Sequence, residues 1–250
     1  MDTTILLFIA AGFLAQIIDG ALGMAYGVSL NTLLLTLGLP PAVASASVHT
    51  AEVATSGVSG FSHWRLKNVD GSLFIRLVIP GVIGACIGAY LLSAIDGDFI
   101  KPFLAVYLIV MGVVILVKAF RKTAPRERPG TPILIGLGLA GSFLDAIGGG
   151  GWGPVVTSSL LAGGQTPRKT IGTVSLAEFF VTTAASITFV LNVDFHEYWQ
   201  IILGLLIGGV LAAPIAAIVC KKVNPRVLMF IVGILILVLS VRVVLLSGWF

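Results

Sequence analysis

The sequence predicts an all-α polytopic membrane protein made of two inverted repeats, each a broken or re-entrant hairpin followed by three transmembrane helices. Three observations lead to this fold class: the composition, an internal repeat, and the distribution of basic residues. Of the 250 residues, 57% are hydrophobic and 10% are charged, whereas about 25% are charged in a soluble domain. The lipid bilayer is therefore the expected partner, and the net charge of +4 gives no reason to expect nucleic acid.

The internal repeat relates residues 12–52 to residues 138–178, which align without a gap at an offset of 126. The identities include acids placed inside apolar sequence, so the match is more than shared hydrophobicity. Repeats that are interrupted at corresponding places are a strong sequence pointer to a transporter site. The principal identities are Asp19 with Asp145, Gly23 with Gly149, Gly27 with Gly153, and Glu52 with Glu178.

The expected segments follow the same order in both halves, which divides the chain into a first repeat (1–120), a cytoplasmic linker (121–130) and a second repeat (131–250). In the first repeat, two hairpin arms and three spans are expected at Thr4–Ile18, Val28–Leu37, Ala42–Ser62, Ser72–Leu92 and Phe103–Val117. In the second repeat they are expected at Thr131–Leu144, Val155–Ala162, Thr170–Leu191, Trp199–Val219 and Val227–Leu246.

The break in each hairpin is clearest at residues 145–155, where the sequence reads DAIGGGGWGPV. Glycine costs about 1 kcal/mol and proline about 3 kcal/mol in a helix interior. Such backbone is tolerated in a bilayer only where it is buried in protein or lines a wet cavity. We expect a helix to restart at Gly153–Pro154 with its positive end facing an anion. A tight turn or a site of close helix packing is the simpler alternative.

The basic residues set the expected orientation. If residues 118–128 are cytoplasmic and each broken segment returns to its own side, every Lys and Arg except Arg76, Lys101 and Arg242 lies inside, as the positive-inside rule requires. Each half then crosses an odd number of times, so the halves have opposite orientations and both termini lie outside. The two breaks would face each other near the midplane, where transporters of this kind hold substrate.

Five titratable residues are candidates for proton coupling. A charged side chain at the bilayer centre is costly and must be buried, paired or protonated. Alternatively, the aspartates cap the restarted helices or bond loop amides, and the glutamates are neutral acids bonded to the facing hairpin. The histidine lies three positions before one glutamate and can share its proton, although the second repeat has Ser175 there. The candidates are Asp19, His49, Glu52, Asp145 and Glu178.

The candidate substrate ligands are main-chain N–H groups of both breaks and nearby hydroxyls, although hydroxyls also serve close helix packing. They are Gly23, Gly27, Ser45, Ser47, Gly148, Gly149, Gly150, Gly151, Trp152, Gly153, Thr170 and Thr173. We expect no cofactor and no metal, because no metal-ligand cluster and no phosphate-binding motif is present. An intramembrane enzyme and a non-transporting membrane subunit are the alternatives to a transporter, but no nucleophile–base pair lies near the breaks.

These features resemble the sulfite exporter TauE/SafE family. The resemblance rests on the run Gly148–Pro154, its weaker partner Asp19–Gly27, and the loop His63–Arg65 followed by Asn68–Asp70. It implies a multi-pass secondary transporter that exports a small sulfur-containing anion, sulfite or an organosulfonate, across the bacterial plasma (inner) membrane. An importer or exchanger of another small organic anion, and a homodimer, stay open. The first break lacks three of the glycines, having Leu22, Met24 and Ala25, and is expected to offer fewer main-chain donors.

Overall fold

The computed structural model describes residues 3–22, 24–120, 129–162, 165–194, 197–222 and 225–246, and over these residues it is helical, without strands. The all-α prediction is confirmed. The first half contains α1 (Thr3–Leu22), α2 (Tyr26–Thr36), α3 (Pro41–Arg65), α4 (Gly71–Ala94) and α5 (Gly97–Phe120). The second half contains α6 (Thr131–Gly148), η1 (Trp152–Thr157), α7 (Ser158–Ala162), α8 (Pro167–Asn192), α9 (Trp199–Lys222) and α10 (Pro225–Leu246).

The described helices suit a bilayer in length and in surface. Four segments are long and apolar enough to cross a membrane: Gly71–Ala94, Gly97–Phe120, Thr131–Gly148 and Arg168–Asn192. Helix α3 has 25 residues, long enough for the hydrocarbon core of about 30 Å at about 1.5 Å per residue, but it is rich in small polar residues. Most of its hydroxyls and its single acid, Glu52, face inward, whereas large apolar side chains such as Ile79 and Ile83 on α4 are exposed.

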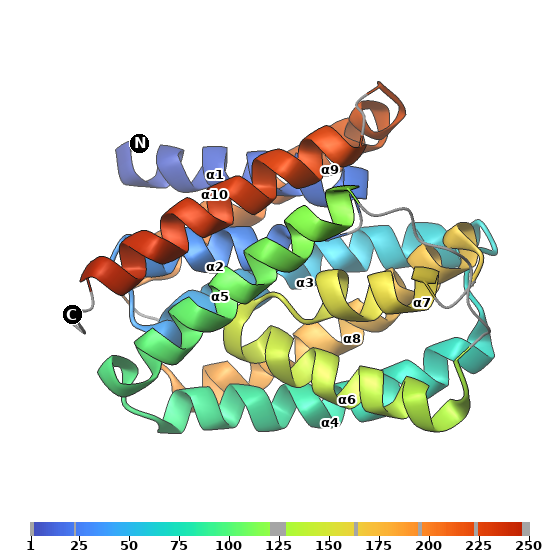
Figure 1. The fold of residues 1–250 in the computed structure, drawn as a ribbon, viewed down its shortest axis with the longest axis horizontal. Coiled ribbons are helices and arrows are strands. Elements are labelled where there is room, and N and C mark those ends of the chain that lie inside the picture. Colours follow the sequence, from blue (N-terminus) through green and yellow to red (C-terminus); the bar gives the residue numbers. More distant parts are fainter. Residues whose placement is uncertain are drawn as a thin grey trace.

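The helices pack in a continuous order that places α3 and α8 at the centre. Helix α1 packs on α9, α9 on α3, α3 on α8, α8 on α4, and α4 on α6. A second group covers the hairpins, because α5 packs on α10 and α10 also contacts α2. Figure 1 shows α4 and α6 along one side and α1 along the other, with α3 and α8 between them.

Helices at equivalent positions in the two halves run antiparallel where they meet. On α3 and α8, Gly57 lies against Phe179 and Gly60 lies against Leu176, so sequence positions rise on one helix as they fall on the other. A Cβ on Gly60 would lie 2.8 Å from the Cα of Leu176. Glycine at this position therefore sets the close approach of the two backbones. Helices α5 and α10 cross in the same sense, with Gly112 against Leu237 and Leu116 against Gly233.

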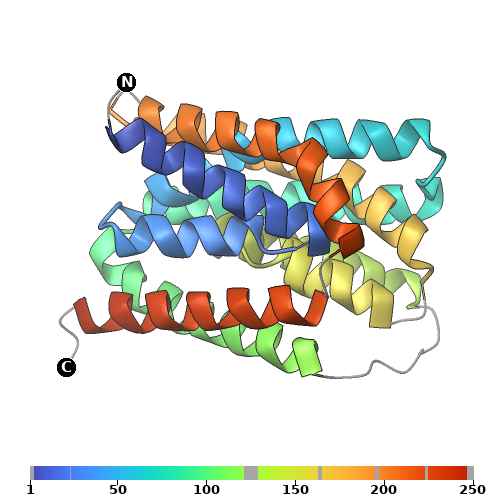
Figure 2. The same ribbon diagram turned by 90° about the horizontal axis from the view of Figure 1, so that it is seen from above.

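The helix ends and the loops between them lie at the two opposite ends of the bundle. The start of α1 and the end of α10 lie at the same end, on the left in both views (Figures 1 and 2). The α4–α5 turn is also at this end. The α3–α4 loop, the start of α6 and the start of α8 lie at the opposite end. The two hairpins thus enter the bundle from opposite ends.

Both breaks are shorter than the sequence predicts. Helix α1 continues past Asp19 to Leu22, and α6 continues past Asp145 to Gly148. The second helix restarts at Trp152 rather than at Gly153–Pro154, through the π-helical turn η1 that runs directly into α7. The aspartates accept hydrogen bonds across the breaks and thereby satisfy amides that would otherwise be left bare. Only residues 149–151 then need a non-helical path.

Candidate functional site

The two hairpin breaks touch each other, backbone against backbone. A Cβ on Gly27 would lie 2.5 Å from the main-chain oxygen of Gly149, and a Cβ on Gly149 would lie 2.5 Å from the carbonyl of Gly27. Gly149 also has φ +70° and ends α6 in the left-handed conformation that suits glycine. Glycine is therefore required on both sides of this contact. Gly23, the first-repeat equivalent of Gly149, lies outside the described residues.

Asp145 closes the second break through its side chain. Its Oδ1 accepts hydrogen bonds from the main-chain N–H groups of Gly151 and Trp152, both at 3.1 Å. These two donors belong to the first positions of the helical segment that η1 and α7 form together. A helix start carries bare N–H groups and a partial positive charge, which a carboxylate satisfies. Asp145 is 4% exposed, so this interaction is shielded from water.

Asp19 makes the equivalent contact at the first break. Among the described residues, its Oδ1 accepts one hydrogen bond, from the N–H of Tyr26 at 3.2 Å. Ala25 precedes α2 with φ 96°, a left-handed conformation that costs about 1–2 kcal/mol for a residue with a Cβ. That the first break is tighter and offers fewer main-chain donors stays a prediction, since Gly23 lies outside the described residues.

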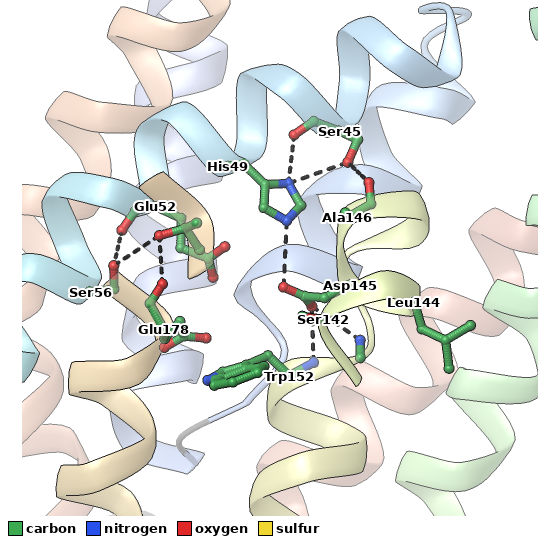
Figure 3. A network of polar contacts seen from close by, with 12 residues as sticks. Ser45, His49, Glu52, Ser56, Ser142, Leu144, Asp145, Ala146, Trp152 and Glu178 are labelled. Carbon is green, nitrogen blue, oxygen red and sulfur yellow. Dashed lines mark hydrogen bonds and ion pairs between the residues drawn. The ribbon is translucent and has the colours of Figure 1, made fainter. Parts of the chain in front are cut away.

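His49 on α3 faces the second break (Figure 3). Its Nδ1 lies 2.8 Å from the main-chain oxygen of Ser45, and because a carbonyl only accepts, Nδ1 carries a proton. The Ser45 hydroxyl in turn donates to the main-chain oxygen of Ala146 on α6. The other ring nitrogen, Nε2, lies 3.4 Å from Oδ2 of Asp145. This is ion-pair distance and longer than an ordinary hydrogen bond.

The two glutamates lie on the facing sides of α3 and α8. Glu52 is 6% exposed and Glu178 is half-buried, and each interacts electrostatically with Asp19 and Asp145. Among the described residues, no hydrogen bond reaches either carboxyl group. Side-chain hydroxyls donate instead to the main-chain oxygens of both residues, from Thr55 and Ser56 to Glu52 and from Thr182 to Glu178. The alternative that these acids bond the facing hairpin thus has no contact in its favour within the described part of the chain.

Three of the side chains near the second break have donor atoms that suit a cation. One ligand atom each from His49, Glu52 and Asp145 lies within 4.8 Å of the others. A closed structural zinc site has four protein ligands, and these three do not complete one. That no metal resides here stays a prediction.

The glycines of the second run are covered by neighbouring groups. A Cβ on Gly148 would lie 2.3 Å from the ring of Tyr107, and one on Gly150 would lie 2.9 Å from the hydroxyl of Tyr107. A Cβ on Gly151 would lie 1.8 Å from the main-chain oxygen of Gly141. Close packing accounts for these glycines in this state, and substrate access to their amides requires a rearrangement. Gly153 is buried in the same turn.

The remaining predicted ligands are placed in different surroundings. The indole N–H of Trp152 donates to the main-chain oxygen of Val174 at 3.2 Å, and the side chain is 1% exposed. The hydroxyl of Thr173 accepts from the N–H of Asp70 at 2.8 Å, so it joins the α3–α4 loop to α8. Ser47 and Thr170 are fully buried, and their hydroxyls have no hydrogen-bond partner among the described residues.

Sequence reasoning missed Lys118 as a site residue and placed it in the cytoplasmic stretch 118–128. Lys118 lies within α5, and its Nζ donates to the main-chain oxygen of Pro154 and to the hydroxyl of Ser158. It thus binds the helix that restarts after the second break. The equivalent position in the second repeat is Val244, so the repeat gives no signal for this contact. Tyr107 was also missed, because nothing in an apolar helix marks one aromatic residue as the cover of a glycine run.

Comparison with known proteins identifies relatives of this chain. The chain is 42% identical over 252 residues to the "Probable membrane transporter protein YtnM" of Bacillus subtilis (strain 168), covering 98% of this chain and 84% of that protein. It is 24% identical to a "Probable membrane transporter protein" of Haemophilus influenzae over 100% of this chain and 98% of that one. A region covering 42% of this chain is 26% identical to 22% of "Sulfite exporter TauE/SafE family protein 3" of Arabidopsis thaliana. No solved structure matches.

The family comparison covers almost the whole fold described above. The model of the family described as "Sulfite exporter TauE/SafE" matches residues 8–243, which include both hairpins, both breaks and the His49–Asp145 contact. With this match and the similarity to a membrane transporter over nearly the full chain, the protein belongs to the sulfite exporter TauE/SafE family of membrane transporters.

Proposed function

We propose that this protein is a secondary transporter that exports a small sulfur-containing anion, sulfite or an organosulfonate, by alternating access. The observation that carries the proposal is the contact between Gly27 and Gly149, which joins the two breaks into one site. Main-chain N–H groups gather there at the start of a helix, and such groups bind oxyanions. The sulfur-containing substrate follows the family description and the name of the Arabidopsis relative.

The inverted repeat is supported by the packing of equivalent helices. Helices α3 and α8 run antiparallel across the centre, and so do α5 and α10. Two halves related in this way carry their hairpins into the bundle from opposite ends. In transporters of this architecture one half rocks against the other around a fixed central site. The α3–α8 interface is the surface along which that movement would occur.

The proposed location is the bacterial plasma membrane with both termini outside. Arg65, Lys67, Arg168 and Lys169 belong to loops and helix ends on the side opposite the termini (Figures 1 and 2). Such an excess of basic residues marks the cytoplasmic side. An anion that leaves the cell would then enter the site from this basic side.

Proton coupling follows from the charges around the site. The described residues place Asp19, Glu52, Asp145 and Glu178 within electrostatic range of one another, with His49 as their basic neighbour. An anion cannot approach four ionised carboxylates in a water-poor interior, because like charges repel strongly at low dielectric. Some of these acids must therefore hold protons when the substrate binds. We propose that movement of those protons across the membrane drives transport of the anion.

The test is sulfite flux in proteoliposomes that contain only this protein, with and without an imposed pH gradient. We expect the parent to carry sulfite and Gly150→Leu to lose transport while still purifying as a folded protein, because a side chain there would strike Tyr107 and Met111. Gly136→Leu is the matched control, since Gly136 lies on the same hairpin with no atom within 4 Å of its Cβ position. Absence of sulfite flux in the parent, or normal flux in Gly150→Leu, would refute the proposal. Preferential uptake of a short carboxylate would favour the importer instead.

A further inference from the structure

We propose that the Asp145 carboxylate is an internal ligand that fills the anion site of the second hairpin, and that the substrate replaces it when the His49–Asp145 pair takes up a proton. This inference rests on the proposed transport of an anion. It assigns the substrate to the N–H groups of Gly151 and Trp152, and it makes Asp145 their competitor for those donors.

The donors of this site already hold a carboxylate. Gly151 and Trp152 donate to the same oxygen, Oδ1 of Asp145, at 3.1 Å each. They begin a continuous helical segment of η1 and α7, from Trp152 to Ala162. A side-chain carboxylate and an oxyanion offer such donors the same kind of acceptor. The structure therefore contains the bound form of the site, with a residue of the chain in the place of the substrate.

Nε2 of His49 is a buried ring nitrogen that faces the other carboxylate oxygen of Asp145, Oδ2. His49 is 1% exposed, and its Nε2 makes no hydrogen bond among the described residues, yet it lies 3.4 Å from Oδ2 of Asp145. Because Nδ1 carries a proton toward Ser45, Nε2 of a neutral ring would present a lone pair to the carboxylate. Two facing lone pairs in a buried site repel each other. The pair is therefore stable with one shared proton, either as imidazolium with carboxylate or as neutral ring with carboxylic acid.

A second proton changes what this pair can bind. With two protons, the pair consists of an imidazolium and an uncharged carboxylic acid. A neutral carboxyl oxygen is a weaker acceptor than a carboxylate, so it holds the N–H groups of Gly151 and Trp152 less strongly. These two donors and the imidazolium together form a positively polarised site that accepts one anion. One proton is then taken up for each anion bound, and the total charge of the site is unchanged.

The surroundings favour this charge balance. The titratable groups facing the pair are Asp19 on α1, Glu52 on α3, Tyr107 on α5 and Glu178 on α8, with Tyr26 on α2 next to the acids. On α4, the packing against α6 is made by glycines near Ser142, Phe143 and Ala146. These neighbours are acids or phenols, so they oppose the entry of an anion that is not accompanied by a proton.

The first hairpin is not built for the same exchange. Within the described part of the chain, Asp19 accepts a single N–H, from Tyr26, and the residue equivalent to His49 in the second repeat is Ser175. Among the described residues, Asp145 is therefore the one of the two aspartates that is paired with an imidazole. Displacement of the aspartate carboxylate by the substrate is therefore expected at the second hairpin alone.

The experiment counts the protons taken up when sulfite binds to the purified protein, by calorimetry in buffers of different ionisation enthalpy. We expect the parent to take up one more proton per sulfite than Asp145→Asn does, since the amide keeps the shape but cannot be protonated. Comparison of the two proteins under the same conditions removes the titration of sulfite itself. In the parent, this extra proton should weaken binding about tenfold further for each unit of pH above the range where the pair is protonated.

The controls separate this inference from the proposed function. Asp19→Asn should retain the extra proton. Sulfite binding by the parent with equal proton uptake in Asp145→Asn would overturn the inference and leave anion transport standing. Failure of the parent to bind sulfite would overturn both. If Asp145→Asn does not fold, His49→Gln is the second variant. It is expected to bind sulfite at least about tenfold more weakly because the imidazolium is lost, while the exchange at Asp145 still takes up one proton. Parent-like binding of sulfite by His49→Gln would also overturn the inference.

Discussion

The hydroxyl of Ser56 on α3 lies 3.5 Å from the hydroxyl of Thr182 on α8, and the two residues occupy the same position in the two halves, 126 residues apart. A residue can meet its own counterpart only close to the axis that relates two repeats. This contact therefore marks the centre of the proposed rocking movement. Small residues flank it, with Gly57 and Gly60 on α3, and they allow the two backbones to slide at close range.

Cross-linking this contact should stop transport. In a protein without Cys86 and Cys220, the pair Ser56→Cys and Thr182→Cys is expected to form a disulfide, since the parent side-chain atoms already meet. Oxidation should lower sulfite flux at least about tenfold and reduction should restore it, because a locked interface holds one state. The bond is detected by mass spectrometry of peptides. Full flux in the oxidised protein would show that α3 and α8 do not move against each other.

Replacing Glu178 by glutamine tests the coupling group. Glu178→Gln keeps the shape of the side chain but cannot release a proton, so we expect sulfite binding to persist and the response of flux to a pH gradient to disappear. The expectation is strengthened by the structure, because no hydrogen bond holds the carboxyl group within the described part of the chain. Flux is measured in proteoliposomes with and without the gradient. A parent-like response would make Glu178 structural.

Removing Lys118 should loosen the second hairpin. Lys118→Met keeps the length of the side chain and loses its hydrogen bonds to Pro154 and Ser158. Hydrogen bonds from a charged donor contribute roughly 1.5–3 kcal/mol each, so a clearly lower unfolding temperature is expected in detergent. The control is Lys101→Met, which removes a pair with the exposed Asp98 and should change the unfolding temperature little. Equal changes in both variants would contradict the assigned contact.

Single-cysteine labelling tests the orientation in the membrane. In the cysteine-free protein, Ala124→Cys in the linker should react with an impermeant reagent only after the cells are opened. Asp98→Cys, in the first turn of α5, should react from outside. The opposite pattern would reverse the orientation and place the basic loops outside.

The sequence predicts the parts of the fold that depend on local chemistry. Glycine marks both breaks and proline marks the second, and the 126-residue offset identifies Asp19 and Asp145 as equivalent. Their capping of loop amides was one of two alternatives, and the structure places both carboxylates on such amides. The exact ends of α1 and α6 were missed, because the energetic gain of those hydrogen bonds lets each helix continue past its aspartate.

The contacts between segments could not be predicted in the same way. The spacing of His49 and Glu52 suggests a shared proton within α3, whereas Nε2 of His49 faces Asp145 on α6. That partner is set by how α3 packs against the hairpin, through Ser45 and Ala146. Lys118 is a similar case, since its charge signals a loop and only the packing of α5 reveals its partners. The choice of substrate, the direction and the coupling ion stay predictions.

Lys118 and His49 bind the second hairpin, and the equivalent residues, Val244 and Ser175, have side chains that cannot make the same contacts with the first hairpin. Under the proposed mechanism, this asymmetry would affect the relative populations of the two transport states. Two perfectly equal repeats would give inward-open and outward-open forms of the same free energy. A difference of about 1.4 kcal/mol changes a population ratio tenfold, which is less than one charged hydrogen bond can contribute. Under the proposed mechanism, two repeats with unequal contacts would give the anion different apparent affinities on the two sides of the membrane.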